Sequence, residues 1–128
     1  MTANICNKHI TYLSYKMLTV DSERLKQLLQ FHEADPKDTF ILFALAKEYE
    51  THSVLDKALF YYLKLKETDS NYIGLYYHLA ALYEEIGQNQ TAIEHYNQGI
   101  EIGKKAGDFH SVSELQNAKV NLEITMGN

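Results

Sequence analysis

Cysteine is almost absent from this chain of 128 residues, in which Cys6 is the only one. A single thiol can form neither an intramolecular disulfide nor a metal site built mainly from thiolates. Such cysteine usage is typical of a reducing compartment, and we expect the protein to be cytoplasmic.

Basic charge is also scarce. The 12 Lys and Arg residues are outnumbered by 17 Asp and Glu residues, which gives a formal net charge of −5, and they form no basic block that could follow a phosphate backbone. Long apolar runs are missing as well, and residues 1–15 lack the apolar core of a secretory signal. We therefore expect no nucleic-acid partner, no membrane span and no export.

Proline and glycine, which interrupt helices, are rare in the first half of the chain. Pro36 is the only proline, and all six glycines follow residue 73. We expect Asp35 to cap a helix that has Pro36 at its first position, where a missing N–H does no harm. Gly87 and Gly107 are placed to end two later helices in a left-handed conformation.

Apolar residues recur at the i, i+3, i+4, i+7 spacing of an amphipathic helix. In the segment 38–51 this stripe comprises Leu42, Leu45, Ala46 and Tyr49. Together with short linkers, which favour antiparallel neighbours, the pattern predicts an all-α fold. The expected helices span about 21–34, 38–51, 54–68, 71–86, 89–105 and 109–125.

One pattern of residues occurs twice, 34 residues apart. Each copy has a Leu-Ala pair, a tyrosine one turn later, and then an alanine followed four residues on by a second tyrosine. The alanines are small where two helix backbones approach, and the tyrosines fill the space beside them. A fixed period of this length is typical of stacked helical hairpins. The predicted packing residues are Leu45, Ala46, Tyr49, Ala58 and Tyr62, and then Leu79, Ala80, Tyr83, Ala92 and Tyr96.

At these residues the chain resembles the tetratricopeptide repeat family, whose pattern is Trp-x2-Leu-Gly-x2-Tyr, then Ala-x3-Phe, then Pro. Leu42 and Tyr76 replace the tryptophan, and Ser70 and Lys104 replace the closing proline. The resemblance implies an α-solenoid of antiparallel hairpins, with a half repeat, two repeats at about 39–72 and 73–106, and a capping helix at about 109–125. We expect a single domain over residues 21–126, after a loosely ordered segment 1–20.

The resemblance also implies a concave side, lined by the first helix of each hairpin, that is free to bind a polypeptide. Phe40, Phe43 and Tyr77 would form its apolar floor, unless they pack beneath the leading helix. The acidic residues would select a basic or amphipathic segment, or they only form a solvated helix face. The predicted groove residues are Phe40, Phe43, Lys47, Glu50, Tyr77, His78, Ala81, Glu84 and Glu85.

No pattern in the sequence indicates catalysis. Phosphate loops, nucleophile elbows and His-Glu-x-x-His are all missing. The six histidines never fall three or four residues apart, so no two share a helical face as metal ligands. We expect no enzyme activity, no metal and no cofactor.

The leading hypothesis is therefore a protein–protein interaction scaffold that binds a peptide or helix of a partner protein in this groove. Two alternatives stay open. One is a homo-oligomeric assembly module, in the simplest case a homodimer, because two full repeats are fewer than the three usually needed for stability. The other is a secretion-type chaperone for an exported client, and nothing in the sequence separates it from a scaffold.

Overall fold

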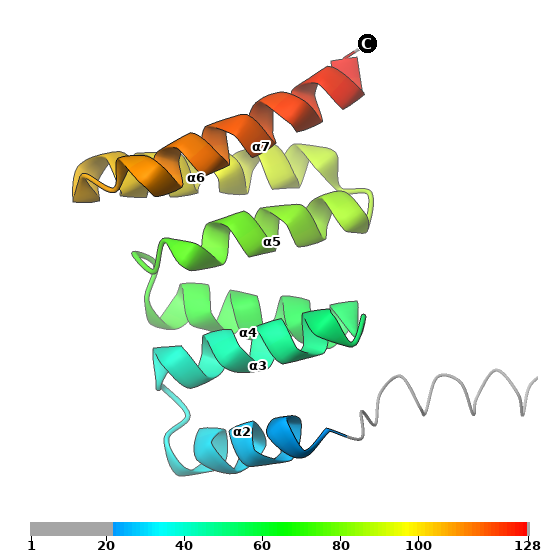
Figure 1. Cartoon of the computed structure of the whole chain (residues 1–128), viewed down its shortest axis with the longest axis vertical. Coiled ribbons are helices and arrows are strands. Elements are labelled where there is room, and N and C mark those ends of the chain that lie inside the picture. Colours follow the sequence, from blue (N-terminus) through cyan, green and yellow to red (C-terminus); the bar gives the residue numbers. More distant parts are fainter. Residues whose placement is uncertain (1–21, 128) are drawn as a thin grey trace, which may run out of the picture. The chain divides into compact units, whose positions relative to one another are not determined.

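Six α-helices and no strand make up residues 22–127, the part of the chain that the computed structural model describes (Figure 1). The all-α fold expected from the sequence is confirmed. The segment expected to be loosely ordered, residues 1–20 with Cys6 and His9, lies outside the described residues. The helices are α2 (Glu23–Ala34), α3 (Thr39–Thr51), α4 (Leu55–Thr68), α5 (Gly74–Glu85), α6 (Asn89–Ala106) and α7 (Phe109–Gly127).

The chain divides into two compact units, residues 1–61 and residues 62–128, and the division falls inside α4. Of the described residues, unit 1 contains α2, α3 and the start of α4, and unit 2 contains the rest of α4 with α5, α6 and α7. A single domain over residues 21–126 stays a prediction.

Helix α3 begins at a later aspartate than the sequence predicts. The carboxylate of Asp38 accepts the N–H of Ile41 at 3.2 Å and caps the helix. The prediction that Asp35 caps this helix, with Pro36 at its first position, is wrong. The N–H of Asp35 still donates to the carbonyl of Phe31, so this residue ends α2, and Pro36 lies in the turn that follows.

Helix α7 begins at an aspartate that precedes it, Asp108. Asp108 accepts the backbone N–H of Ser111 at 3.1 Å and its hydroxyl at 2.8 Å, and these hydrogen bonds lower the pKa of the Asp108 carboxyl. The Ser-x-x-Glu sequence from Ser111 to Glu114 is therefore not a capping box, because the helix has already begun at residue 109. Gly107 ends α6 in the left-handed conformation, as predicted, with φ of 71°.

The turns before α4 and α6 each place one residue in the left-handed conformation. These residues are Ser53, with φ of 59°, and Gly87, with φ of 84°. They are 34 residues apart, so the repeat extends to the backbone of the turns. Glycine adopts this conformation freely, whereas a residue with a Cβ atom does so at a penalty. Ser53 therefore occupies in the first copy the left-handed position that glycine has in the second.

The two copies also share a pair of stacked rings that the Leu-Ala pattern does not include. In unit 1 the ring of Tyr49 stacks on Tyr61, with centroids 5.6 Å apart and planes 5° apart. In unit 2 the ring of Tyr83 stacks on His95, with centroids 5.0 Å apart and planes 29° apart. Each residue of the first pair lies 34 positions before its counterpart. An imidazole therefore replaces a phenol at the same place in the second copy.

In unit 2, α6 packs against both α5 and α7, and α5 also contacts α7. Within this unit α5, α6 and α7 run antiparallel to one another in turn, as Figure 1 shows. Two glycines of α6 allow this close packing. A Cβ atom at Gly99 would lie 2.7 Å from the Cβ atom of Tyr76, and one at Gly103 would lie 2.6 Å from Cγ2 of Val112. The contacts among these three helices fix the positions of α5 and α7 relative to each other.

Candidate protein-binding surfaces

The residues predicted to pack the repeats lie mostly in the interior. Nine of the ten are buried, and Tyr83, whose ring stacks on His95, is half-buried. The two alanines and two tyrosines of each copy are therefore occupied within the fold. A ligand would have to contact other side chains of the same helices.

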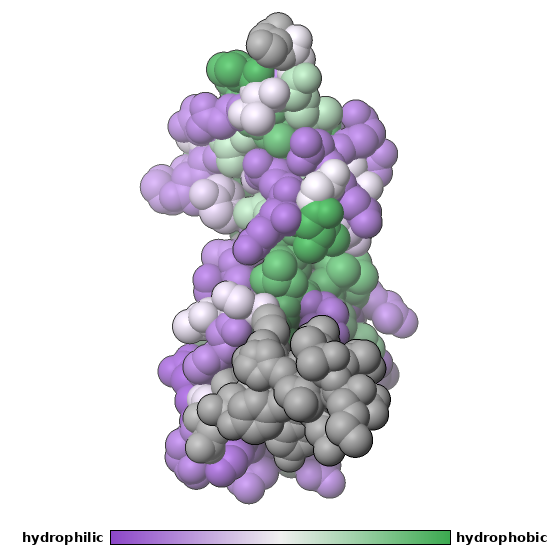
Figure 2. Space-filling view, turned by 90° about the vertical axis from the view of Figure 1, so that its right-hand side faces the viewer, coloured by the Kyte–Doolittle hydropathy of each residue, from purple (hydrophilic) through white to green (hydrophobic). Residues whose placement is uncertain are grey.

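The exposed apolar side chains mark where such contacts are available. The face drawn in Figure 2 carries a green group of hydrophobic residues framed by purple hydrophilic ones. Among the predicted groove residues, Phe40 and Tyr77 are large, apolar and exposed. The large apolar side chains exposed among residues 22–127 are Phe31, Phe40, Phe60, Leu63, Tyr77, Ile86, Phe109, Val120, Ile124 and Met126.

In unit 1 the predicted groove residues of α3 differ in how accessible they are. Phe40, near the start of the helix, has 69% of its surface exposed, whereas Phe43 is half-buried. Lys47 and Glu50 form an ion pair with 3.8 Å between Nζ and Oε2. Because both side chains of this pair are partly exposed, a ligand charge can compete for either of them. In unit 1, Phe40 is thus the most accessible of the four.

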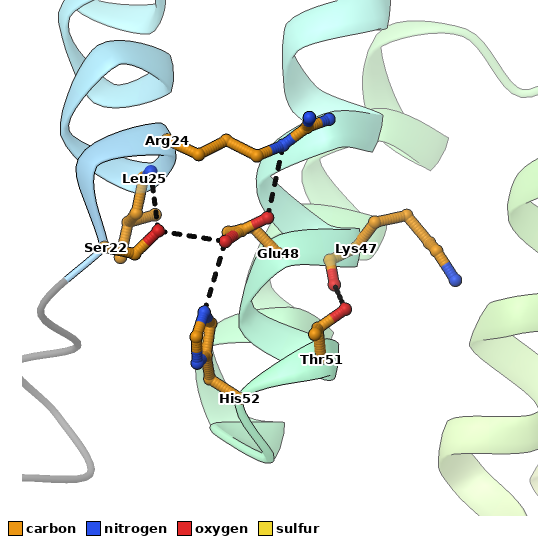
Figure 3. A network of polar contacts seen from close by, with 7 residues as sticks. All are labelled: Ser22, Arg24, Leu25, Lys47, Glu48, Thr51 and His52. Carbon is orange, nitrogen blue, oxygen red and sulfur yellow. Dashed lines mark hydrogen bonds and ion pairs between the residues drawn. The ribbon is translucent and has the colours of Figure 1, made fainter.

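A polar network on the α2 side of α3, which the sequence analysis missed, is centred on Glu48 (Figure 3). Its carboxylate accepts a hydrogen bond from the Ser22 hydroxyl at 3.0 Å and pairs with Arg24 Nε at 3.2 Å. It also contacts His52 Nε2 at 3.1 Å. Lys47 points away from this cluster in Figure 3. Glu48 therefore ties the start of α2 to the end of α3, and it serves the fold of unit 1.

In unit 2 three rings form a chain of contacts that reaches the surface. Tyr62 is fully buried, and its ring stacks on His78 with centroids 6.0 Å apart and planes 3° apart. His78 in turn meets the ring of Tyr77 edge-on, at 5.6 Å and 81°. Tyr77 has 42% of its surface exposed. The exposed ring of Tyr77 is thus connected through His78 to the buried ring of Tyr62.

The other predicted groove residues of α5 are less available. Glu84 accepts a short hydrogen bond from the hydroxyl of Tyr96, which joins α5 to α6. Burial and this hydrogen bond raise the pKa of the Tyr96 hydroxyl, so the tyrosine stays protonated and Glu84 stays engaged. Ala81 is half-buried, and Glu85 is exposed. Of the two acids, Glu85 is the one open to a ligand.

A pocket of about 450 Å³ lies between α5 and α7, and we call it the α5–α7 pocket. Tyr77 and His78 line it from α5, so the structure brings these two predicted residues together with a set from α7 that the sequence analysis missed. The available signal was the i, i+4 spacing of two asparagines in a helix assigned only a capping role. The residues from α7 are Glu114, Asn117, Ala118 and Asn121.

A second depression, of about 520 Å³, lies between α6 and α7. Charges of both signs line it, and Lys104 pairs with Glu101 at 3.9 Å while Lys119 pairs with Glu123 at 3.7 Å. Val120, at its edge, is 52% exposed. The polar residues Asn97 and Gln116 and the buried Ile100 complete the lining.

The histidines of the described chain serve packing or surface pairs. Within residues 22–127 no three His, Cys, Asp or Glu side chains are grouped so that they could hold a metal ion. His95 is buried, where its Nδ1 donates to the Thr91 carbonyl at 2.9 Å and its Nε2 accepts from Lys66 at 3.1 Å. Burial lowers the pKa of His95 and also that of Lys66. The imidazole is therefore neutral in the folded protein at pH 7.

Membrane insertion through a helix has no support in the described part of the chain. None of the helices within residues 22–127 combines the length and apolar character that crossing a bilayer requires.

Two solved structures resemble the chain in both sequence and fold. A solution NMR structure of a tetratricopeptide repeat domain protein from Salinibacter ruber is 41% identical, with a TM-score of 0.69, and the match covers 73% of this chain and 95% of that one. The chain belongs to the tetratricopeptide repeat family. A crystal structure of a tetratricopeptide repeat domain protein from the same organism is 43% identical, with a TM-score of 0.65, and the match covers 67% of this chain and 96% of that one.

Membership in the tetratricopeptide repeat family confirms the fold predicted from the 34-residue period, an α-solenoid of helical hairpins. The hairpins α3–α4 and α5–α6 fall within the two predicted repeats, and the roles of α2 as a half repeat and of α7 as a capping helix stay predictions. No protein-family model matches the sequence, and no curated protein matches it significantly.

Proposed function

We propose that this tetratricopeptide repeat protein is a scaffold that binds a peptide or helix of a partner protein. The binding residues are the exposed ones on the first helix of each repeat, α3 or α5. The observation that carries the proposal is Tyr77, an exposed ring held by His78 and, through it, by the buried Tyr62. The family supports the same reading, because arrays of this kind leave one surface free for another polypeptide.

The energetics favour Tyr77 as an anchor. Aromatic side chains bury roughly 150–250 Å² each at interfaces and have few rotatable bonds, so that little conformational entropy is lost on binding. The ring of Tyr77 already contacts His78, and this contact restricts its rotation before a partner arrives. Phe40 of unit 1 adds a second exposed ring, and Glu85 adds an accessible negative charge.

A site-specific photo-crosslinker tests the proposal. Tyr77 is replaced by p-benzoylphenylalanine, and Phe109 is replaced in a matched control, because Phe109 is exposed in the same unit and does not line the α5–α7 pocket. We expect irradiation in extract to give a discrete crosslinked protein from position 77, and excess unlabelled wild-type protein should compete it away. Equal, uncompeted crosslinking from the two positions would contradict the proposal.

Self-association is a second candidate function, and the surface of α7 favours it. Phe109, Val120, Ile124 and Met126 are between 43% and 69% exposed, which is more apolar surface than a solubilising cap needs. The charge pairs of the neighbouring depression carry both signs, so a second copy could match them. Sedimentation at roughly 50 µM, far above the Kd of a stable dimer, should show a dimer that Ile124→Glu dissociates. A monomer under these conditions rules out this function.

A further inference from the structure

The lining of the α5–α7 pocket contains one carboxylate, no lysine or arginine, and one imidazole, that of His78, which contacts the rings of Tyr62 and Tyr77. Glu114 is its only Asp, Glu, Lys or Arg residue, and Tyr77, Asn117 and Asn121 are uncharged. Glu114 contacts His110 Nε2 at 3.2 Å, but this is an ion pair only when His110 is protonated, and both side chains are more than half exposed. A stronger cation can therefore take the place of His110 at this carboxylate.

One wall of the pocket is the supported ring of Tyr77. Cations are attracted to the faces of aromatic rings, and a guanidinium group does this best because it is planar and weakly hydrated. A guanidinium also binds a carboxylate through two parallel hydrogen bonds, whereas an ammonium group acts as a point charge. Tyr77 and Glu114 thus offer the two partners that an arginine side chain prefers.

Asn117 and Asn121 supply the remaining polar contacts. They are exposed and lie one helical turn apart on α7, so their amides face the same side of the helix. Each amide can donate to a carbonyl and accept from an N–H, which suits the backbone of a bound peptide. The volume of about 450 Å³ lies within the roughly 300–1,000 Å³ typical of ligand sites, so a side chain and adjoining backbone fit together.

We infer that the α5–α7 pocket binds an arginine side chain of the partner segment, between the ring of Tyr77 and the carboxylate of Glu114. This inference rests on the proposed function and adds the chemistry of the partner. The protein's formal net charge of −5 favours the approach of a basic segment over an acidic one. Arginine is preferred to lysine, because only its planar group satisfies ring and carboxylate together.

The test uses the whole chain, labelled with ¹⁵N, and a small probe in place of the unidentified partner. N-acetyl-arginine methylamide is titrated in, and the glutamine and lysine analogues are titrated separately. We expect the arginine probe to shift the backbone amides of Tyr77 and His78 and the side-chain amides of Asn117 and Asn121. The lysine analogue should bind several-fold more weakly, and the glutamine analogue should leave these signals in place.

Glu114→Gln removes the charge while it keeps the size of the side chain, and it should weaken the arginine probe about tenfold. Glu123→Gln is the matched control, because it makes the same change of charge on the same helix outside the pocket, and it should leave the affinity unchanged. Raised salt should weaken the probe in the wild type far more than in Glu114→Gln.

Three results would overturn the inference: no shifts at these four residues, equal shifts with the glutamine analogue, or equal losses in the two glutamate variants. The crosslinking experiment at position 77 is independent of all three. If it captures a partner while the arginine probe gives no specific shifts, the scaffold function is supported and the arginine pocket is refuted. If the probe binds as expected and no partner is captured, the scaffold function falls.

Discussion

Replacing Gly99 by alanine should destabilise unit 2, because the added Cβ atom would collide with α5 and α7. The added Cβ atom would lie 2.7 Å from the Cβ atom of Tyr76, 3.0 Å from Cδ1 of Leu115 and 3.2 Å from Cγ of Tyr76. A Cβ atom is fixed to its backbone, so Tyr76 can yield only if α5 moves. Tyr76 is also held at its far end, where its hydroxyl donates to the Ser70 carbonyl at 2.5 Å.

The expected magnitude combines two opposing effects. Overpacking a core contact costs about 1–3 kcal/mol. Alanine in place of glycine inside a helix recovers about 1 kcal/mol. The difference is roughly 0–2 kcal/mol, and we expect the free energy of unfolding to fall by about 1 kcal/mol, the middle of this range.

Gly103→Ala is the matched control on the same helix. Its added Cβ atom would meet Cγ2 of Val112 at 2.6 Å and Cδ1 of Ile73 at 2.8 Å. Cδ1 of Ile73 is the end of a flexible side chain, and Cγ2 of Val112 is one bond further from the backbone than the Cβ atom of Tyr76. Urea denaturation followed by far-ultraviolet circular dichroism gives both free energies. We expect Gly99→Ala to lose more stability than Gly103→Ala. Equal or greater stability of Gly99→Ala relative to the wild type, or the reverse order of the two variants, would refute the reasoning from backbone proximity.

Three further predictions concern His95, Ser53 and Glu48. Burial lowers the pKa of His95 below its ordinary 6.5, so the unfolded chain takes up a proton first as the pH falls, and stability should drop on acidification below about pH 6.5. His95→Gln should flatten this slope between pH 7.5 and 5.5 in urea denaturation, and an unchanged slope would assign it to other groups. Ser53→Gly should raise the urea midpoint slightly. A left-handed residue with a Cβ atom is penalised by about 1–2 kcal/mol, and the greater entropy of glycine in the unfolded chain offsets only part of the stability gained by removing this penalty. A lower midpoint would show that Ser53 is not strained. Glu48→Gln should lower stability by about 0.5–1 kcal/mol, because it removes the charge that pairs with Arg24. The loss should be smaller in 1 M salt, which screens the largely exposed Arg24. A loss independent of salt would contradict an electrostatic origin.

The fold was predictable from the sequence because its signal is repeated. The Leu-Ala pair, Tyr49 and its counterpart Tyr83 recur at a fixed interval, and such periodicity reflects packing between neighbouring helices. Individual helix starts were less predictable, because Asp35 and Asp38 can both cap a helix. The choice between them depends on where α2 ends, and the hydrogen bond from Asp35 to the Phe31 carbonyl decides it.

The candidate site was predictable only in part. The accessible ring of Tyr77 follows from a stripe that the packing pattern leaves free. The contribution of α7 does not follow, because this helix lacks the repeated motif and its asparagines become meaningful only when α5 lies beside them. Likewise, the hydrogen bond from Tyr96 to Glu84 joins a predicted packing residue to a predicted groove residue. It becomes apparent only from the spatial arrangement of α5 and α6.

The central claim is that the exposed ring of Tyr77 anchors a partner protein, and the dissociation constant of the crosslinked partner tests it most directly. Calorimetry would compare the wild type with Tyr77→Ala and with Phe109→Ala, each verified as folded by circular dichroism. We predict that Tyr77→Ala weakens binding by about tenfold or more, as expected of an interface anchor, and that Phe109→Ala leaves it unchanged. Wild-type affinity in Tyr77→Ala would contradict the account.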